Sequence, residues 1–263
     1  MAEPVAQRYG KAAVSVYRTD GDRLFACDVR LVVSGPFESV YTEGDNSLVV
    51  ATDSMKNFIH RTALDFEGAT LEDFLAGVGS RFLTRYEHVE AVDLRARELV
   101  FARREGLVFQ RLYDDVGVAE LLLDRTGSAR ERSGREGLHL VKLSGSSFAG
   151  FIRDEYTTLP ETADRPLFVH LDVHWRHADS ARRAAGEEVR EVLVSTFADF
   201  DSASIQHLVH EMGMRALERF PELQTISFEA ENRLWDRAQE ADGAAVYTDA
   251  RPPYGLIELT LER

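Results

Sequence analysis

Two pairs of histidines have the spacing at which two side chains could share a metal ion. His170 and His174 lie on one face of a predicted strand, and His207 and His210 lie on one side of a predicted helix. Either pair could supply half of a metal site, but the sequence offers no obvious third ligand for it. Polar lining of a tunnel or an interface is the ordinary role of such histidines, and we predict no metal ion.

Cys27 is the only cysteine, and this limits the chemistry further. A single thiol cannot form an intramolecular disulfide or a thiolate-rich zinc site. The absence of an intramolecular disulfide is consistent with a protein of a reducing compartment. The sequence also has neither a glycine-rich phosphate loop nor a nucleophile elbow.

Five other residues could contribute to a polar and aromatic site, although each also has an ordinary role. A lysine such as Lys11, near the start of a strand, is usually solvated, and Thr52 at a strand-to-helix junction could be an N-cap. Phe148 could be a core residue, Arg165 could pair with the preceding aspartate, and Gln206 could be a helix-surface amide. Residue types alone leave both interpretations open.

Composition restricts the partners of the chain. Its 263 residues carry a formal net charge of -14, which argues against sequence-independent nucleic-acid binding, since that needs a basic surface. The 44% hydrophobic content is ordinary for a soluble protein, and no apolar run approaches the length of a membrane span. The N-terminal residues do not resemble a secretory signal, so we expect a cytoplasmic protein without membrane or nucleic-acid partners.

The elements that must position these residues follow from periodicity. Alternating apolar residues on both sides of the turn at 19–22 predict a β-hairpin, and Thr70 with Asp73 resembles the capping box of a helix. A further helix should begin at Thr52 or Asp53, whose side chain would cap it. In this half, strands are predicted at 47–51, 88–102, 107–113 and 116–123, followed by a loop at 124–137.

The pattern then recurs. Strands are predicted at 138–143, 167–175, 225–228 and 255–261, with helices over 181–197 and from about 202. The two halves repeat an architecture without evident residue-level identity. Both halves predict an α+β fold in which an antiparallel sheet is covered by helices on one face. A partner subunit is the simplest cover for the other face of the sheet. A sheet face left in solvent is the alternative.

Short motifs are spread over nearly the whole chain. They include Tyr9-Gly10-Lys11, Val-Val-Ala-Thr-Asp-Ser at 49–54, Phe-Ala-Gly-Phe-Ile-Arg-Asp-Glu-Tyr-Thr-Thr-Leu at 148–159, Asp164-Arg165, Ser204-Ile205-Gln206 and Tyr-Gly-Leu-Ile-Glu at 254–258. Each motif alone is weak, whereas their order and spacing together are specific. In these features the chain resembles the urate oxidase (uricase) family.

The resemblance implies tandem tunnelling-fold domains, at 1–136 and 137–263, in a homotetramer whose active sites are shared between subunits. It also implies a reaction without a cofactor, in which O₂ oxidises urate to 5-hydroxyisourate and hydrogen peroxide. Lys11 and Thr52 would remove a proton from the substrate, since desolvation can lower the pKa of a lysine and make it a base. Asp53 would offer its backbone N–H at a helix start.

By the same resemblance, the other site residues cradle the ring. Phe148 would stack on the heterocycle, and Arg165 and Gln206 would bind its two edges. Ile205 would add a backbone N–H, and Asn232 would lie over the ring where oxygen or water binds.

The chain departs from the family pattern at one position. The family usually carries Asn-x-His, and this chain has Asn232-Arg233-Leu234. Because leucine cannot relay a proton or hold a water molecule, two alternatives stay open: an enzyme acting on a different purine- or pterin-like heterocycle, and a non-catalytic purine-binding protein. The presence of Lys11 and Thr52 argues against the second, since a binding protein needs no base.

Overall fold

The computed structural model describes residues 6–263, so the first five residues of the predicted first domain lie outside the described part. The chain divides into two compact units, Met1–Ser133 and Gly134–Arg263, each with its own hydrophobic core. Within the described residues, no helix is both long and apolar enough to cross a membrane.

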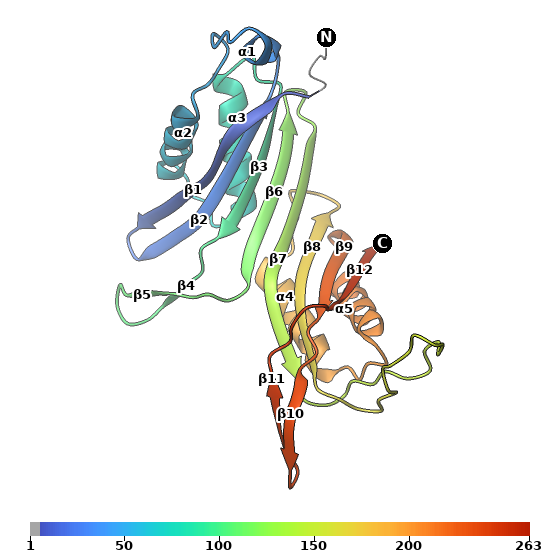
Figure 1. The fold of residues 1–263 in the computed structure, drawn as a ribbon. Helices are drawn as coiled ribbons and strands as arrows, with labels where there is room; N and C mark the ends of the chain where they lie inside the picture. Colours follow the sequence, from blue (N-terminus) through green and yellow to red (C-terminus); the bar gives the residue numbers. More distant parts are fainter. Residues whose placement is uncertain (1–5) are drawn as a thin grey trace. The chain divides into compact units, whose positions relative to one another are not determined.

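In the first unit, an antiparallel sheet is covered on one face by two long helices (Figure 1). Its strands follow the order β1-β2-β3-β6, and the first part of β7 lies beside β6. The elements are β1 (Arg8–Asp20), β2 (Arg23–Ser34), α1 (Glu38–Thr42), α2 (Thr52–Leu64), α3 (Leu71–Arg85), β3 (Ala91–Glu98), β4 (Phe101–Arg103), β5 (Phe109–Arg111), β6 (Val116–Asp124) and β7 (Ala129–Lys142).

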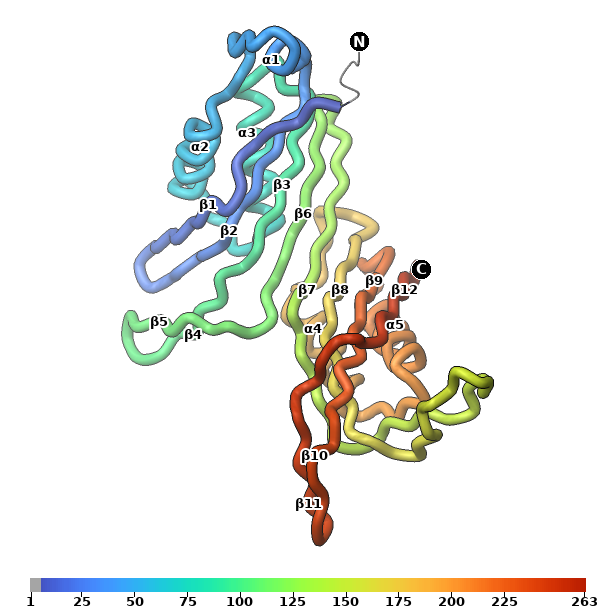
Figure 2. The backbone as a smooth tube through the Cα atoms, viewed as in Figure 1, coloured from blue at the N-terminus to red at the C-terminus, as the bar shows by residue number. Residues whose placement is uncertain are grey.

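The second unit repeats this plan, with strand order β7-β8-β9-β12 and helices α4 and α5 on one face (Figure 1). A two-stranded hairpin, β10–β11, extends away from this unit's sheet (Figure 2). The elements are β8 (Leu167–His177), α4 (Gly186–Asp199), α5 (Ile205–Arg219), β9 (Leu223–Asn232), β10 (Asp236–Ala241), β11 (Ala244–Thr248) and β12 (Gly255–Glu262). The predicted α+β class, with helices on one face of antiparallel sheets, is confirmed.

The structure confirms the predicted hairpin turn and the predicted cap of α3. The β1–β2 hairpin closes at Asp20 and Arg23, with Gly21 at a φ of 59°. Thr70 caps α3 by accepting a hydrogen bond from Asp73 N at 3.2 Å, and Ser204 caps α5 in the same way.

Other predictions were wrong. Residues 129–137 belong to β7 and not to a loop, because their polar side chains have partners there: Arg132 Nε donates to Glu120 Oε2 on β6 at 3.0 Å. Residues 47–51 form a turn and an extended segment without strand pairing, and α4 begins at Gly186, five residues later than predicted. Neither the β10–β11 hairpin nor the short helix α1 was predicted.

The second long helix and the strand after it match between the two units, which the sequence did not reveal. A shift of 134 residues relates the capping residues Thr70 and Ser204, and also the helix glycines Gly79 and Gly213. A Cβ at Gly79 would lie 3.2 Å from Leu94 and 3.4 Å from Val92, and a Cβ at Gly213 would meet Phe228 and Ile226, which are those residues shifted by 134. Each glycine therefore allows the same close approach of helix to sheet.

In each unit, an arginine binds the corner at which the second long helix ends and the chain turns into the next strand. Arg125, just after β6, donates to the carbonyl oxygens of Leu83, Tyr86 and Val89 at 2.8–3.0 Å, where α3 ends and turns into β3. Arg263, just after β12, donates to the equivalent carbonyl oxygens of Leu217, Phe220 and Leu223. A cation there satisfies carbonyl groups that the helix end leaves unpaired.

We expect Arg125→Ala to lower the free energy of unfolding by about 1–2 kcal/mol, because three carbonyl groups lose a charged donor at a partly exposed site. Urea unfolding followed by circular dichroism measures this change. Arg130→Ala, at an exposed position on β7, is the control and should change stability by less than about 0.5 kcal/mol. Equal stability of the two variants would show that the corner is held by its backbone alone.

Candidate active site

Lys11 lies on the helix-covered face of the first unit because a β-bulge changes the alternation of β1. Lys11 is opposite the buried Leu31, and the register then shifts so that Val14 is opposite the buried Val29. Residues directly opposite each other in an antiparallel pair share a face of the sheet, so Lys11 and Val14 both face the helices. Inside the bulge, Ala13 has a φ of 53°, which non-glycine residues rarely adopt.

The two residues before Lys11 fix its surroundings. Val50 N donates a hydrogen bond to the Tyr9 hydroxyl at 2.8 Å, which ties β1 to the segment leading into α2. Burial raises the pKa of Tyr9, so this hydroxyl stays protonated at neutral pH. A Cβ at Gly10 would lie 1.9 Å from Leu31 O, so only glycine fits there. The Tyr-Gly-Lys motif is therefore a positioning device for the lysine.

Thr52 is the first residue of α2, and the expectation that Thr52 or Asp53 caps this helix was wrong. The N-cap is Ala51, and no side chain accepts a hydrogen bond from the first turn. The Asp53 carboxylate instead accepts from Lys56 Nζ at 2.6 Å and from Asn57 Nδ2 at 3.2 Å. Backbone N–H groups at such an uncapped helix start favour an anionic ligand.

The hydrogen bond between Tyr9 and Val50 brings the end of β1 that carries Lys11 close to this helix start. The hydrogen bond and charge of Lys56 are the main causes that lower the pKa of Asp53, and the charge of Lys11 lowers it further. Since the first unit holds Lys11, Thr52 and Asp53 at one end of β1 and α2, it brings three of the predicted site residues together.

The other five predicted residues belong to the second unit. Ser147 N donates to Ser202 O at 2.9 Å, and Phe148 exchanges two backbone hydrogen bonds with Thr162 at 2.8 and 2.9 Å. These bonds join three segments that are distant in sequence: 144–148, 162–165 and the entry to α5. They hold the Phe148 backbone near the chain that enters that helix, and the Phe148 ring stacks on Phe151 with centroids 4.9 Å apart.

Arg165 has the environment of a ligand-binding residue. Its guanidinium lies 5.7 Å from the centroid of the Phe148 ring, and burial lowers the pKa of Arg165. Its Nε is buried and has no hydrogen-bond partner among the described residues. The Asp164 carboxylate accepts hydrogen bonds from the backbone of Gly145 and Ser146, at 2.8 and 3.2 Å, and does not pair with Arg165. A buried donor left without a partner is costly unless a ligand completes it.

Asn232 is the last residue of β9, the strand that follows α5 along the chain. The 15 residues of α5 span about 22 Å and the ten residues of β9 about 33 Å, so the strand runs back along the helix and past its first residues, Ile205 and Gln206. Asn232 lies two residues after the buried Ala230 on β9. Because side chains alternate between the faces of a sheet, Asn232 points to the same helix-covered face as Ala230. Its Oδ1 is buried and has no hydrogen-bond partner among the described residues. Ile205 is buried, and Gln206 is exposed.

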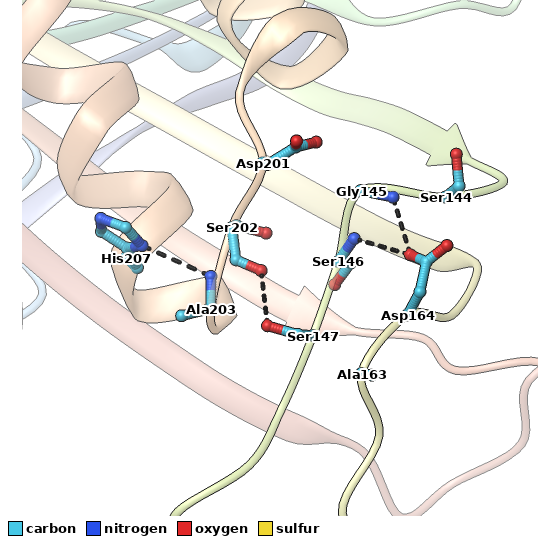
Figure 3. Close-up of a pocket in the computed structure, with 10 residues that line it drawn as sticks. All are labelled: Ser144, Gly145, Ser146, Ser147, Ala163, Asp164, Asp201, Ser202, Ala203 and His207. Carbon is cyan, nitrogen blue, oxygen red and sulfur yellow. Dashed lines mark hydrogen bonds between the residues drawn. The ribbon is translucent and has the colours of Figure 1, made fainter.

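The second unit contains a polar cavity of about 480 Å³, and several of its lining residues are sequence neighbours of the predicted site residues (Figure 3). It is lined by Ser144, Gly145, Ser146, Ser147, Ala163, Asp164, Asp201, Ser202, Ala203 and His207. Three of them directly precede or follow Phe148, Arg165 and Gln206 in sequence. Ser202 Oγ is buried without a partner among the described residues, a feature that only the folded structure reveals.

The histidines form contacts of other kinds. His170 stacks on His139 with ring centroids 3.6 Å apart, and His174 Nε2 lies 3.2 Å from Glu136 Oε1. His207 Nδ1 accepts from Ala203 N at 3.4 Å. Within residues 6–263, no group of three or more His, Cys, Asp or Glu side chains is placed to hold a metal ion. Leu234 is half-buried in the segment between β9 and β10.

Known proteins resemble this chain along nearly its whole length. A family profile described as uricase matches residues 7–111 and 131–258. A uricase from Haloferax volcanii is 39% identical, with 97% of each chain covered. The crystal structure of a uricase from Bacillus fastidious superimposes with a TM-score of 0.92 at 36% identity, covering 98% of this chain and 94% of that one.

A third relative is longer. The uric acid degradation bifunctional protein of Bacillus sp. (strain TB-90) is 40% identical over 94% of this chain. The present chain spans only 58% of the length of that protein.

Proposed function

The chain belongs to the uricase family, and from this we propose that it oxidises urate with O₂ and water to 5-hydroxyisourate and hydrogen peroxide. The family match over both units carries the proposal. The two buried polar atoms without partners, Arg165 Nε and Asn232 Oδ1, support it because they lie in the unit predicted to cradle the ring. In the reaction, the urate anion loses two electrons and O₂ gains them, so O₂ becomes the peroxide.

In this proposal the first unit supplies the base. The Lys11 amine takes a proton from urate with Thr52 as the relay, and the Asp53 N–H binds the resulting anion. Only three of the 31 basic residues are lysines, at positions 11, 56 and 142. A guanidinium cannot give up its proton at working pH, so of the two basic side chains only a lysine could act as a base at position 11.

The second unit supplies the cradle. Phe148 stacks on the ring, Arg165 and Gln206 bind opposite edges, and the Ile205 N–H binds beside Gln206. Asn232 lies over the ring and orients oxygen or water. We propose that no cofactor takes part, because the electron-rich urate anion is itself the reductant. Activity should then survive exhaustive dialysis against EDTA.

We further propose a homotetramer of tandem tunnelling-fold chains, with domains at 1–136 and 137–263 and with active sites shared between subunits. The 143–166 connection supports this arrangement because it exposes large apolar side chains, with Leu143, Ile152 and Tyr156 at 72–88% exposure. Such side chains are usually covered by a partner. Light scattering on active protein tests this, and a fully active monomer would overturn it.

One observation favours a second candidate function. Leu234 removes the histidine of the family pattern, as expected of an enzyme that acts on a different purine- or pterin-like heterocycle. Purified protein mixed with urate in air separates the candidates. Loss of urate absorbance with one peroxide formed per urate supports urate oxidation, whereas tight binding without turnover favours the second candidate.

Arg165→Ala should weaken binding of an azapurine inhibitor by about 1–3 kcal/mol, because the ring edge would lose its charged partner in a desolvated site. Isothermal titration calorimetry measures the change. The exposed Arg182→Ala is the control and should bind normally. An unchanged affinity in Arg165→Ala would remove this residue from the cradle.

A further inference from the structure

Three side chains make contact at the end of β9, around Asn232. The guanidinium of Arg233 lies 3.8 Å from the centroid of the Tyr254 ring. Its Nε donates to Glu231 Oε2 at 2.7 Å, and the same carboxylate oxygen is 3.8 Å from His170 Nδ1. Arg233 is therefore held by a flat ring and by a carboxylate, although both of its neighbours are partly exposed.

These contacts surround Asn232 on the strand and on its neighbour. Glu231 and Arg233 precede and follow Asn232, and Tyr254 precedes Gly255, which is the β12 partner of Asn232. Because successive residues of a strand point to opposite faces, Glu231 and Arg233 lie on the face away from Asn232. The three side chains thus act on Asn232 through the backbone.

These contacts lie at the point where the chain leaves the sheet. After Arg233, whose N–H donates to Phe168 O at 2.9 Å, the chain leaves the sheet and forms the β10–β11 hairpin (Figures 1 and 2). Every residue of β10 is exposed, and a two-stranded hairpin has little stability of its own. Asn232 is paired with Val169 and Gly255, so Arg233 is the first residue beyond the paired end of β9, where motion of the hairpin would enter the strand.

We propose that Arg233, Glu231 and Tyr254 form a clamp that fixes the end of β9 and so positions the Asn232 amide over the substrate ring. Its catalytic effect rests on the proposed function, in which Asn232 orients oxygen or water during the reaction. The three clamp residues are positioning residues, since we place them on the face away from Asn232 and they act through the backbone.

The variants Tyr254→Ala and Arg233→Lys test the clamp. The first removes the ring, and the second keeps the charge but loses the planar group that stacks. We expect kcat to fall by up to about 10²-fold while KM changes by less than about twofold, because the loss concerns orientation in the reaction and not ring binding. Tyr254→Phe keeps the stacking ring and should restore most of kcat. Arg237→Lys, on the exposed hairpin, is the control that should match the unmodified enzyme.

Hydrogen exchange of the peptide spanning 230–234 gives a readout that does not depend on activity. We expect faster exchange there in Tyr254→Ala, with no change in the melting temperature of the second unit's core. Unchanged exchange, or a rise in KM with kcat intact, would overturn the clamp. If the unmodified enzyme does not turn over urate, the proposed function fails, and the exchange measurement still decides whether the clamp holds the strand end.

Discussion

Lys11→Met is expected to lower urate turnover by about 10²–10⁴-fold, the usual contribution of a general base, while inhibitor binding stays nearly normal. The bulge in β1 allows Lys11 to lie on the helix-covered face, at the strand end that Tyr9 ties to the segment leading into Thr52. Methionine keeps much of the length and packing of lysine and removes only the amine. Single-turnover absorbance measurements and inhibitor titration separate the chemical step from binding.

Lys11→Arg is the sharper variant because it keeps the positive charge but cannot release a proton. It should be as slow as Lys11→Met if the amine is a base. Arg8→Met, on the same strand and in an exposed ion pair with Asp93, should remain active. Native turnover in Lys11→Arg would mean that position 11 supplies only charge.

The second large effect concerns Leu234. We expect the natural chain to turn over urate slowly while it binds the ring with near-normal affinity. The turnover rate should rise by about 10²–10⁴-fold in Leu234→His, since acid–base assistance is typically of this size. A leucine at this position excludes water and removes a proton relay. Steady-state kinetics on both proteins, together with inhibitor affinities, measure the change.

Two results would contradict this account of Leu234. Rapid turnover by the natural chain would show that another group performs the histidine's task. Tight urate binding without turnover in either protein would favour a related heterocycle as the substrate. Leu234→Asn is a useful control, because it restores polarity without a group that titrates near neutral pH.

The elements that the sequence predicted well are those whose local chemistry and periodicity agree. The Asp-Gly turn specifies the first hairpin, and Thr70 specifies the start of α3. The first part of β7, residues 129–137, escaped prediction because its polar side chains find cross-strand partners such as Glu120, which composition cannot reveal. The helix α2 begins at Thr52 as predicted, but its cap was misjudged, because Thr52 and Asp53 have the residue types of a cap and lie inside the helix.

The candidate site was predictable only through its resemblance to a family. No periodicity indicates the bulge at Ala13, which decides the face that Lys11 occupies. The partnerless atoms of Arg165 and Asn232 likewise depend on packing between distant segments. Residue types alone left a solvated lysine and a surface arginine as equally reasonable interpretations.

The matching corners and glycines of the two units have an evolutionary meaning. A shift of 134 residues relates the capping residues, the helix glycines and the corner carbonyl groups, whereas the corner arginines Arg125 and Arg263 are 138 residues apart. A shared shift with small later differences is expected if one ancestral unit was duplicated and the copies then diverged. The same shift carries Gln206 to Glu72 and Asn232 to Glu98, so the first copy has carboxylates where the second has amides. These carboxylates accept hydrogen bonds within the first copy, from Ser133 Oγ and Gly117 N. At these two positions the first copy therefore uses its side chains for internal hydrogen bonds, whereas in the second copy Asn232 Oδ1 is buried without a partner among the described residues.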